Sequence, residues 1–550
     1  MDGTQFQPIV NFIWSIADLL RDRYKRGKYR DVILPMTLIG RLDAVLEPTK
    51  EKVLACKTQN EDLSPEGLTP LLCHASGFEF YNASNFTLKE LLNNPAEIKE
   101  NFRNYLHGFS PNIRDILEKF KFEAQLDTLA GSNILYALVQ EFCSKKVNFS
   151  INDIKDDQGR VIQKGLSNLG MGYVFEELIR QFNEENNEEA GEHFTPREVI
   201  RLMAELVFRP VQKQIQKGAF TIYDNACGSG GMLTESKAFL EDVLQSRATF
   251  ELCGQEVNDE TYALCKADML IKGENPENIK FGSTLSQDGF KGEKFNFMLT
   301  NPPFGKAWGS EQTKCKSDPR FNVGVTGADD GQMMFLLNML SKMKDTKQGS
   351  RLASVHNGSA LFNSDSGQVA IRSHIIKNDY LEAIIALPLD LFYNTGIPTF
   401  IWILSNRKPA HRQGKVQLID ATSYFEPMQK SLGSKRNHLT PTHIETLVKL
   451  FLEQPKSPHS VIVENDDLGY AKFSVFSLKP AQELLEEDSF NALCNHQAIL
   501  KRLQELESSP PQAKTHLQNP QRVFRGFRPP HPQTQNQRGA RDPSSPKRTF

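Results

Sequence analysis

The sequence lacks the features that mark membrane, secreted and metal-binding proteins. No apolar run approaches the roughly 20 residues that a helix needs to cross a bilayer, and we expect no signal peptide. The 8 cysteines among 550 residues are scattered and include no Cys-x-x-Cys pair, which excludes the common zinc sites and a regular disulfide framework. These absences predict a cytoplasmic protein with no membrane segment and no bound metal.

A strong charge of either sign is also absent. The chain has 65 Lys and Arg against 67 Asp and Glu, and its formal net charge is -2. Such a surface offers nucleic acid no general attraction, so any affinity for DNA must come from a local patch or from a partner. The length and the hydrophobic content of 39% allow two to four folding units with real cores.

The first 150 residues have the apolar spacing of helices. One helical face gathers Val10, Ile13, Trp14, Ala17 and Leu20. A second apolar face runs through 33–45, and further helical stretches continue to about residue 142. We therefore predict an all-helical N-terminal domain over residues 1–150.

From about residue 166, short β-rich runs alternate with helical windows. The runs lie at 220–224, 250–257, 295–300, 352–356, 381–388, 400–404 and 416–419. Strands that alternate with helices predict an α/β fold with a doubly wound, mostly parallel, Rossmann-like sheet, which we place at 160–455. The last two runs leave no room for a long helix between them, and they predict an antiparallel hairpin at the sheet edge.

A glycine-rich turn follows the first of these strands. The strand ends in Asp224, and Asn-Ala-Cys-Gly-Ser-Gly-Gly leads from it into a helical window. Glycines let the backbone turn sharply and approach a ligand closely, and the amides at the helix start can face an anionic group. The next strand ends in Glu256, which could accept the hydroxyls of a ribose. The sequence has no phosphate-binding lysine pattern, so a ligand with an adenosine part is favoured over a dinucleotide or ATP. The alternatives are that the glycine turn binds no ligand and that Glu256 is an ordinary exposed carboxylate.

The apolar strand at 295–300 ends abruptly in Asn301-Pro302-Pro303-Phe304. Prolines cannot continue a central strand, so the chain must leave the sheet at its carboxyl edge, where ligands bind in this architecture. The Asn301 amide and a rigid backbone carbonyl offer two acceptors for an exocyclic amino group, and Phe304 offers a stacking face. Accepting those N–H bonds would localise the nitrogen lone pair for attack on an electrophilic methyl group. An accidental tetrapeptide, the alternative, is expected in about one chain in a hundred or fewer.

The segment 191–198, Gly-Glu-His-Phe-Thr-Pro-Arg-Glu, has the pattern of a helix start. Thr195 and Glu198 have the spacing of a capping box, and Pro196 suits the first helical position. This pattern needs no function to explain it, and His193 has no partner of the kind that a metal site requires.

The glycine turn, Gly254-Gln255-Glu256 and the Asn-Pro-Pro-Phe tetrapeptide occur together and in this order. In this combination the sequence resembles the modification subunits of type I restriction-modification systems, which are DNA adenine-N6 methyltransferases of the gamma motif order. The likeness runs from about residue 10 to about residue 470. It includes 14–46, which is similar to the helical N-terminal domain of the family, and 191–197, 355–362 and 387–397.

The resemblance implies a class I methyltransferase domain that uses S-adenosyl-L-methionine. It implies catalytic roles for Asn301, Pro302, Pro303 and Phe304, with the target adenine flipped out of the duplex. The implied cofactor-binding residues are Glu192, His193, Phe194, Thr195, Pro196, Arg197, Asp224, Ala226, Gly228, Ser229, Gly230, Gly231, Glu256 and Ser283. We expect Gly230→Asp to abolish binding by placing a carboxylate where the carboxylate of the cofactor lies.

The implied partners are double-stranded DNA, a specificity subunit that reads the target, and a restriction subunit, with two copies of this chain per complex. The chain departs from the family at Asn225, usually Pro, at Asn296, usually Asp, and at Ser283, usually an Asp or Asn that contacts the adenine of the cofactor. The likeness fades after 468–470, so we assign 456–509 to an atypical C-terminal segment. Residues 510–550, rich in Pro, Gln and Arg, are expected to form a disordered basic tail.

Two other functions fit parts of this pattern. Asn-Pro-Pro-aromatic also serves methyltransferases that act on protein glutamine or on RNA, although the segments at 191–197 and 387–397 argue against them. A catalytically impaired DNA-binding or assembly subunit would account for Ser283 and the unusual C-terminus.

Overall fold

The computed structural model describes residues 7–21, 23–144, 146–186, 195–393 and 395–468. The expected tail at 510–550, most of the segment at 456–509, and the predicted cofactor residues Glu192, His193 and Phe194 lie outside this range. Within the range, no helix has both the length and the apolar composition to cross a membrane.

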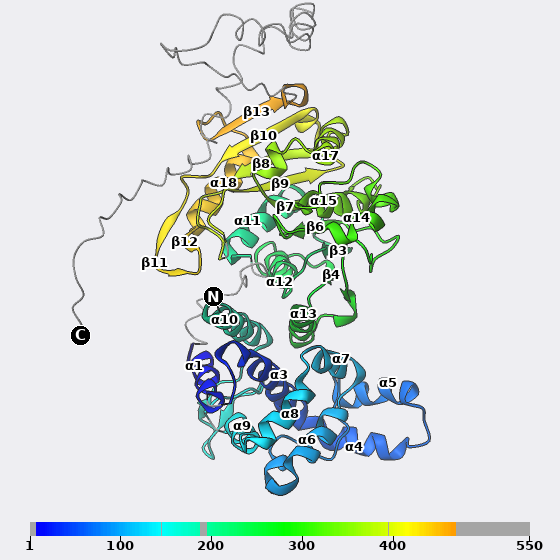
Figure 1. Cartoon of the computed structure of the whole chain (residues 1–550), viewed down its shortest axis with the longest axis vertical. Helices are drawn as coiled ribbons and strands as arrows, with labels where there is room; N and C mark the ends of the chain where they lie inside the picture. The colour runs from blue at the N-terminus through cyan, green and yellow to red at the C-terminus, as the bar shows by residue number, and fades with distance from the viewer. Residues whose placement is uncertain (1–6, 22, 145, 187–194, 394, 469–550) are drawn as a thin grey trace, which may run out of the picture. The chain divides into compact units, whose positions relative to one another are not determined.

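The N-terminal part of the chain is built of helices, as the apolar spacing predicts (Figure 1). Val10, Ile13, Ala17 and Leu20 are buried and Trp14 is half-buried. The helices are α1 (Gln7–Ser15), α2 (Ala17–Leu20), α3 (Arg30–Leu46), α4 (Lys50–Gln59), α5 (Pro65–Ser76), α6 (Ile98–His107), α7 (Pro111–Lys119), α8 (Phe122–Gly131) and α9 (Leu135–Phe142).

Two helices from farther along the chain complete this hydrophobic core. They are α10 (Asn168–Asn186) and α13 (Asp259–Lys272). Helix α13 is apolar on opposite faces: Leu264 and Leu270 pack with the N-terminal helices, whereas Cys265 and Met269 pack with the core of the sheet. A helix that is apolar on more than one face is a buried helix.

A nine-stranded sheet is the centre of the following part of the described chain (Figure 1). Its strand order is β13-β10-β8-β9-β7-β6-β3-β4-β5. Most neighbours are parallel, and β9 and β13 are the antiparallel members. The strands are β3 (Ala219–Asp224), β4 (Thr249–Glu256), β5 (Ile279–Phe281), β6 (Phe297–Thr300), β7 (Arg351–Asn357), β8 (Leu381–Ala386), β9 (Thr399–Ser405), β10 (Lys415–Asp420) and β13 (Ser460–Glu464). The predicted doubly wound, mostly parallel fold is confirmed.

The predicted hairpin between 400–404 and 416–419 is wrong. Strand β9 lies between β7 and β8 and is antiparallel to both, and β10 lies beyond β8 and parallel to it. Both edges of β9 are paired, one with β7 and the other with β8, so β10 cannot pair with β9. The short connection after β9 crosses the end of β8, and β10 pairs with the other edge of β8. Short elements without a clear pattern were also missed: β1 (Ile154–Lys155), β2 (Val161–Gln163), β5, β11 (Glu426–Leu432), β12 (Lys435–His438) and β13.

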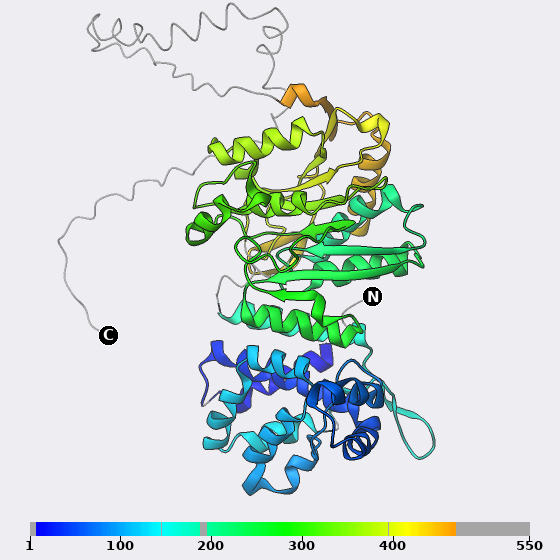
Figure 2. The ribbon, with the colours of Figure 1, turned by 90° about the vertical axis from the view of Figure 1, so that its right-hand side faces the viewer.

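Helices cover both faces of the sheet (Figure 2). Helices α11 (Arg197–Phe208), α12 (Gly231–Ala238), α13 and α18 (Pro441–Glu453) share one core with the sheet. Helices α14 (Gly309–Lys316), α15 (Gln332–Ser341), α16 (Ser359–Phe362) and α17 (Ser366–Lys377) connect the strands on the β6 side. The chain progresses outward through β4 and β5 on one side of β3 and through β6 and β7 on the other. The carboxyl ends of β3 and β6 therefore mark the topological switch point, where open α/β sheets bind ligands.

Gly230 fixes the strand-to-helix junction at this switch point. Its φ is +87°, and a Cβ there would lie 2.8 Å from Cys265 Sγ and 3.0 Å from Met269 Cε. Gly273, at the end of α13, has a similar φ of +77° but no heavy atom within 4 Å of the same position. A substitution at Gly273 therefore tests backbone strain alone, whereas one at Gly230 tests backbone strain together with a steric clash.

We predict that Gly230→Ala destabilises the fold more than Gly273→Ala does. The left-handed backbone alone costs an alanine about 1–2 kcal/mol, and overpacking against α13 adds about 1–3 kcal/mol at Gly230. Denaturant unfolding of the two variants measures the difference. Equal losses would show that α13 accommodates the extra methyl group.

Candidate functional site

A pocket opens at the carboxyl ends of β3, β4 and β6. It brings together most of the residues predicted from the sequence: Thr195, Arg197, Asp224, Ala226, Gly228, Ser229, Gly231, Glu256, Ser283, Asn301 and Pro303. Sequence reasoning missed other lining residues: Ile200, Asn225, Cys227, Met232, Glu235, Gln255, Val257, Gly282, Thr284, Lys306 and Phe335. Many of these residues are neighbours in sequence of the predicted ones, and this proximity could have indicated them. Phe335 comes from α15, and its sequence neighbourhood gives no such signal.

Asp224 is a fully buried carboxyl group at the end of β3. It accepts hydrogen bonds from the Ala226 amide at 3.0 Å and from Thr300 Oγ1 at 2.7 Å. Burial raises the pKa of Asp224 to about 7, helped by the nearby Glu256 and opposed by the two hydrogen bonds. A cation that enters the pocket would favour the ionised carboxylate.

Glu256, at the end of β4, is held by backbone amides. Its Oε2 accepts from the Gly228 amide at 3.0 Å, and its Oε1 accepts from the amides of Val257 at 2.9 Å and Asn258 at 2.8 Å. A carboxylate offers about four acceptor positions, so one position on Oε2 is open to a ligand. Glu256 also joins β4 directly to the glycine turn.

Asn301 follows β6 and faces the same pocket. Its Nδ2 donates to Thr195 Oγ1 at 3.0 Å, which fixes the orientation of the amide. Its Oδ1 is buried and has no hydrogen-bond partner among the described residues. A buried acceptor without a partner costs about 1–3 kcal/mol, so the site favours a ligand that donates to this atom.

The predicted capping box at Thr195 and Glu198 is wrong. Helix α11 begins at Arg197, and the preceding Pro196 has an extended backbone, so Thr195 lies one residue too far from the helix to cap it. The Thr195 hydroxyl instead accepts from Asn301, and the Glu198 carboxylate accepts from Lys435 Nζ.

Four predicted residues are absent from the pocket lining. Pro196 and Pro302 are buried, and Phe304 is half-buried and packs against the core of the sheet. Gly230 lies behind the pocket wall, because its Cβ direction points toward α13. The expectation that an aspartate at position 230 would reach the carboxylate position of the cofactor is therefore wrong. Gly230 supports the turn by its conformation.

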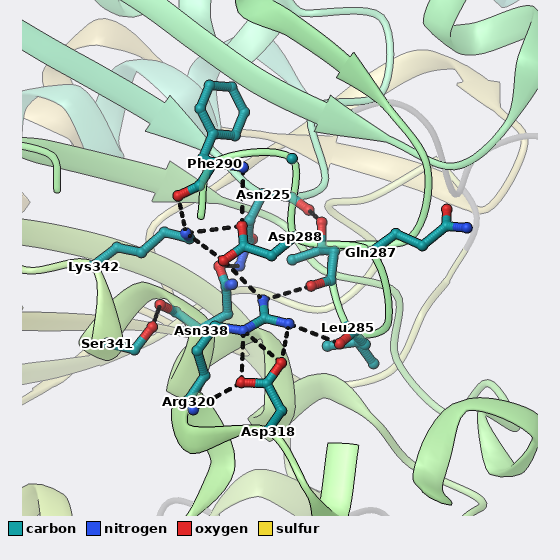
Figure 3. A network of polar contacts seen from close by, with 12 residues as sticks. Asn225, Leu285, Gln287, Asp288, Phe290, Asp318, Arg320, Asn338, Ser341 and Lys342 are labelled. Atoms are coloured by element: carbon teal, nitrogen blue, oxygen red, sulfur yellow. Dashed lines mark hydrogen bonds and ion pairs between the residues drawn. The ribbon is translucent and has the colours of Figure 1, made fainter. Parts of the chain in front are cut away.

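The loop after β5 carries Ser283, and charged side chains hold its backbone in place. Arg320 donates to the carbonyl oxygens of Thr284 at 2.8 Å and Leu285 at 2.9 Å, and Asp318 pairs with the same guanidinium (Figure 3). Lys342 donates to Asp288 in the same network. This side of the pocket is therefore preorganised.

The structure explains the substitution at Asn225, and nothing in it explains the one at Asn296. Asn225 Nδ2 donates to the Phe335 carbonyl at 2.9 Å and to Asn338 Oδ1 at 3.1 Å, bonds to α15 that a proline could not form. Asn296 Oδ1 accepts from the Thr221 amide at 3.1 Å, as an aspartate carboxylate also could. Asn225 lines the pocket, whereas Asn296 is absent from the lining.

The segment 355–362 contains a buried polar cluster at the end of β7. His356 Nδ1 lies 3.1 Å from Gln332 Oε1, and Gln332 Nε2 donates to Asp330 and Asn357. Burial lowers the pKa of His356 to about 3, with a smaller opposing effect from Asp330. His356 is therefore neutral near pH 7 and does not act as a cationic group.

Comparison with known proteins identifies both parts of the chain. The N-6 DNA Methylase family matches residues 167–483, and the HsdM N-terminal domain matches residues 9–142. The methylase subunit of the type I restriction enzyme MjaIX from Methanocaldococcus jannaschii is 24% identical over 84% of this chain and 80% of its own length. The MpnII methylase subunit from Mycoplasma pneumoniae is 24% identical over 84% of this chain and 87% of its own length.

A solved structure has the same fold. The methyltransferase subunit of a type I restriction-modification system from Streptococcus thermophilus aligns with a TM-score of 0.64 and 22% identity, over 84% of this chain and 96% of that chain. The resemblance inferred from the sequence motifs is confirmed, and the comparisons do not favour a protein-glutamine or RNA methyltransferase. The chain belongs to the N-6 DNA methylase family, with the two-part organisation of the methylase subunits of type I restriction enzymes.

Proposed function

We propose that this chain transfers the methyl group of S-adenosyl-L-methionine to the N6 amino group of a flipped adenine in double-stranded DNA. The observation that carries the proposal is the buried, unpartnered Oδ1 of Asn301 at the switch point of the sheet. An amino group that donates to Oδ1 would satisfy this atom. The pocket alone would also suit a small molecule with an amino group. The family match supports DNA as the target.

The residues of the pocket suit this cofactor. When bound, S-adenosyl-L-methionine supplies a methyl group on a positively charged sulfur. Asp224 and Glu256 provide two carboxylates for a ligand that carries positive charge and ribose hydroxyls. The turn has only small or absent side chains at Gly228, Ser229 and Gly231, so a ligand can approach its backbone closely.

We assign each part of the proposed cofactor to one element, and the strand order supports this assignment. In the order β6-β3-β4-β5, the strands lead to Asn301, the glycine turn, Glu256 and Ser283. The methyl group must lie nearest Asn301, where the acceptor nitrogen binds. The methionine part would then lie on the turn, the ribose on Glu256, and the adenine on the loop after β5.

Asn301 and the following backbone would act on the amino group of the target. Oδ1 of Asn301 would accept one N–H. A backbone carbonyl of the rigid segment that begins at Pro302 would be the second acceptor. These hydrogen bonds concentrate the lone pair on N6 as its geometry becomes tetrahedral. Thr195 holds the amide in the orientation that this role requires.

The family and the near-neutral charge support a proposal for the partners. We propose that a specificity subunit supplies target recognition, that a restriction subunit joins the full complex, and that two copies of this chain take part. The formal charge of -2 gives the isolated chain little general attraction for DNA. Catalysis and sequence recognition would then reside in different chains.

We predict that Asn301→Ala lowers the methyl-transfer rate by about 100-fold or more, because one preorganised transition-state hydrogen bond is worth about 2.7–4 kcal/mol. Cofactor affinity should hardly change, because the contact strengthens mainly in the transition state. Single-turnover methylation by the assembled complex and calorimetry of cofactor binding measure the two effects. Thr195→Ala is the matched control and should cost about ten-fold, because it removes only the anchor of the amide. An Asn301→Ala complex that methylates DNA at the original rate would exclude this mechanism.

We predict that affinity for S-adenosyl-L-methionine rises about ten-fold between pH 5.5 and pH 7.5. Asp224, with a pKa of about 7, is largely neutral at the lower pH and largely ionised at the higher one. Only the ionised form attracts the cationic cofactor, so affinity increases as the proton leaves. Calorimetry across this range should give a much flatter profile for Asp224→Asn, which cannot ionise. A flat profile for the unsubstituted chain would contradict the assigned role of Asp224.

We predict that the isolated chain binds DNA weakly, without sequence preference, and with an affinity that falls steeply with salt. Addition of the specificity subunit should produce selective binding. Fluorescence anisotropy with matched duplexes at two salt concentrations measures both effects. Selective binding by the isolated chain would show that it reads the sequence itself.

A further inference from the structure

We propose that Glu311 fixes the direction of the Ser283 hydroxyl and thereby makes the adenine end of the pocket selective for a purine with an amino group. Glu311 is a positioning residue, since it acts through Ser283. The proposal rests on the proposed cofactor and identifies how its base is recognised.

Ser283 lines the pocket at the end that lies beyond Glu256. It follows β5, the edge strand next to β4, and it is half-buried in the pocket wall. A ligand whose ribose lies at Glu256 and whose reactive group lies near Asn301 must place its base at this end. The hydrogen-bonding character of Ser283 therefore bears directly on which base fits.

The Ser283 hydroxyl proton is already used within the protein. Ser283 Oγ donates to Glu311 Oε2 at 2.7 Å, and it accepts from the Leu285 amide at 3.2 Å. A hydroxyl has one proton and two acceptor positions. The remaining position of Oγ can therefore only accept, and it suits the amino group of a base.

Glu311 is itself held against this loop. It lies in the first turn of α14, and its second oxygen, Oε1, accepts from Ser286 Oγ at 3.3 Å. The loop is held in turn by Arg320, which binds the carbonyl oxygens of Thr284 and Leu285. Both oxygens of the carboxylate are thus committed to the loop that forms the base end of the pocket.

The arrangement distinguishes an amino group from a carbonyl group. Adenine presents an amino donor at its 6-position, whereas hypoxanthine presents a carbonyl acceptor there. Against Ser283, the carbonyl would face an oxygen that has no proton to give, unless the bond to Glu311 breaks. Without Glu311 the hydroxyl can rotate and donate, so the distinction should weaken.

The test compares binding of S-adenosylhomocysteine and S-inosylhomocysteine to the full chain by calorimetry. We expect the unsubstituted chain to prefer the adenosyl compound ten-fold or more, in keeping with the cost of an unsatisfied buried acceptor. In Glu311→Ala the preference should fall toward one, mainly through tighter binding of the inosyl compound. A merely structural role would weaken both compounds equally and leave the ratio unchanged.

Two further variants serve as the control and the rescue. Ser286→Ala removes the other partner of Glu311, outside the pocket lining, and should preserve the ratio. The double variant Ser283→Asp with Glu311→Gln moves the carboxylate into the pocket wall and should restore a strong preference for the adenosyl compound. An unchanged ratio in Glu311→Ala, with normal binding of S-adenosylhomocysteine, would overturn the proposal for Glu311 alone. Failure of the unsubstituted chain to bind either compound would overturn the proposed cofactor as well.

Discussion

The hydrogen bond from Asn301 Nδ2 to Thr195 Oγ1 determines which atom of the amide faces the reaction. The two ends of an asparagine amide have similar shapes but opposite hydrogen-bonding character. With Nδ2 engaged, the buried Oδ1 is left as an acceptor without a partner. The proposed chemistry needs an acceptor at this place, so the reactive geometry depends on where the scaffold holds Thr195.

Polar contacts hold both ends of α11, the helix that follows Thr195 and Pro196. At the start of the helix, Glu198 binds the buried Lys435, which also donates to the Leu391 carbonyl. At the other end, Arg351 donates to the Val207 carbonyl at 3.0 Å and forms a bidentate pair with the buried Glu382. Burial alone would raise the pKa of Glu382, but the charge and hydrogen bonds of Arg351 outweigh it and hold the pKa below its ordinary value. Such buried pairs are costly to break from one side, so they resist movement of α11.

The sequence was most informative where the covalent chain dictates geometry. Prolines must leave a central strand, and glycines at a strand-to-helix turn permit close approach of a ligand. The sequence alone therefore places Asn301 and the turn after Asp224 at one sheet edge. Hydrogen-bonding choices were less accessible, because Thr195 had both a local partner, Glu198, and a distant one, Asn301. Spacing along the chain favours the local partner, whereas the folded structure selects the distant one.

Topology and side-chain direction escaped prediction for a similar reason. The short spacing between β9 and β10 suggested a hairpin, but the edge of β9 was already taken by β8, a fact of the whole sheet. Gly230 likewise belonged to the right motif, yet whether its Cβ would enter the pocket or the core depends on a φ of +87° and on the position of α13. The boundary at residue 150 and the roles of the individual site residues stay predictions.

Helix α13 packs against both the glycine turn and the N-terminal helices. One face of α13 carries Cys265 and Met269, whose side chains lie nearest to the position that a Cβ of residue 230 would take. Another face carries Leu264 and Leu270, which belong to the N-terminal core. A buried helix packed on two sides transmits strain, because protein interiors are too dense to absorb a shift locally. The N-terminal helices and the glycine turn therefore pack against the same helix, and the position of α13 constrains both.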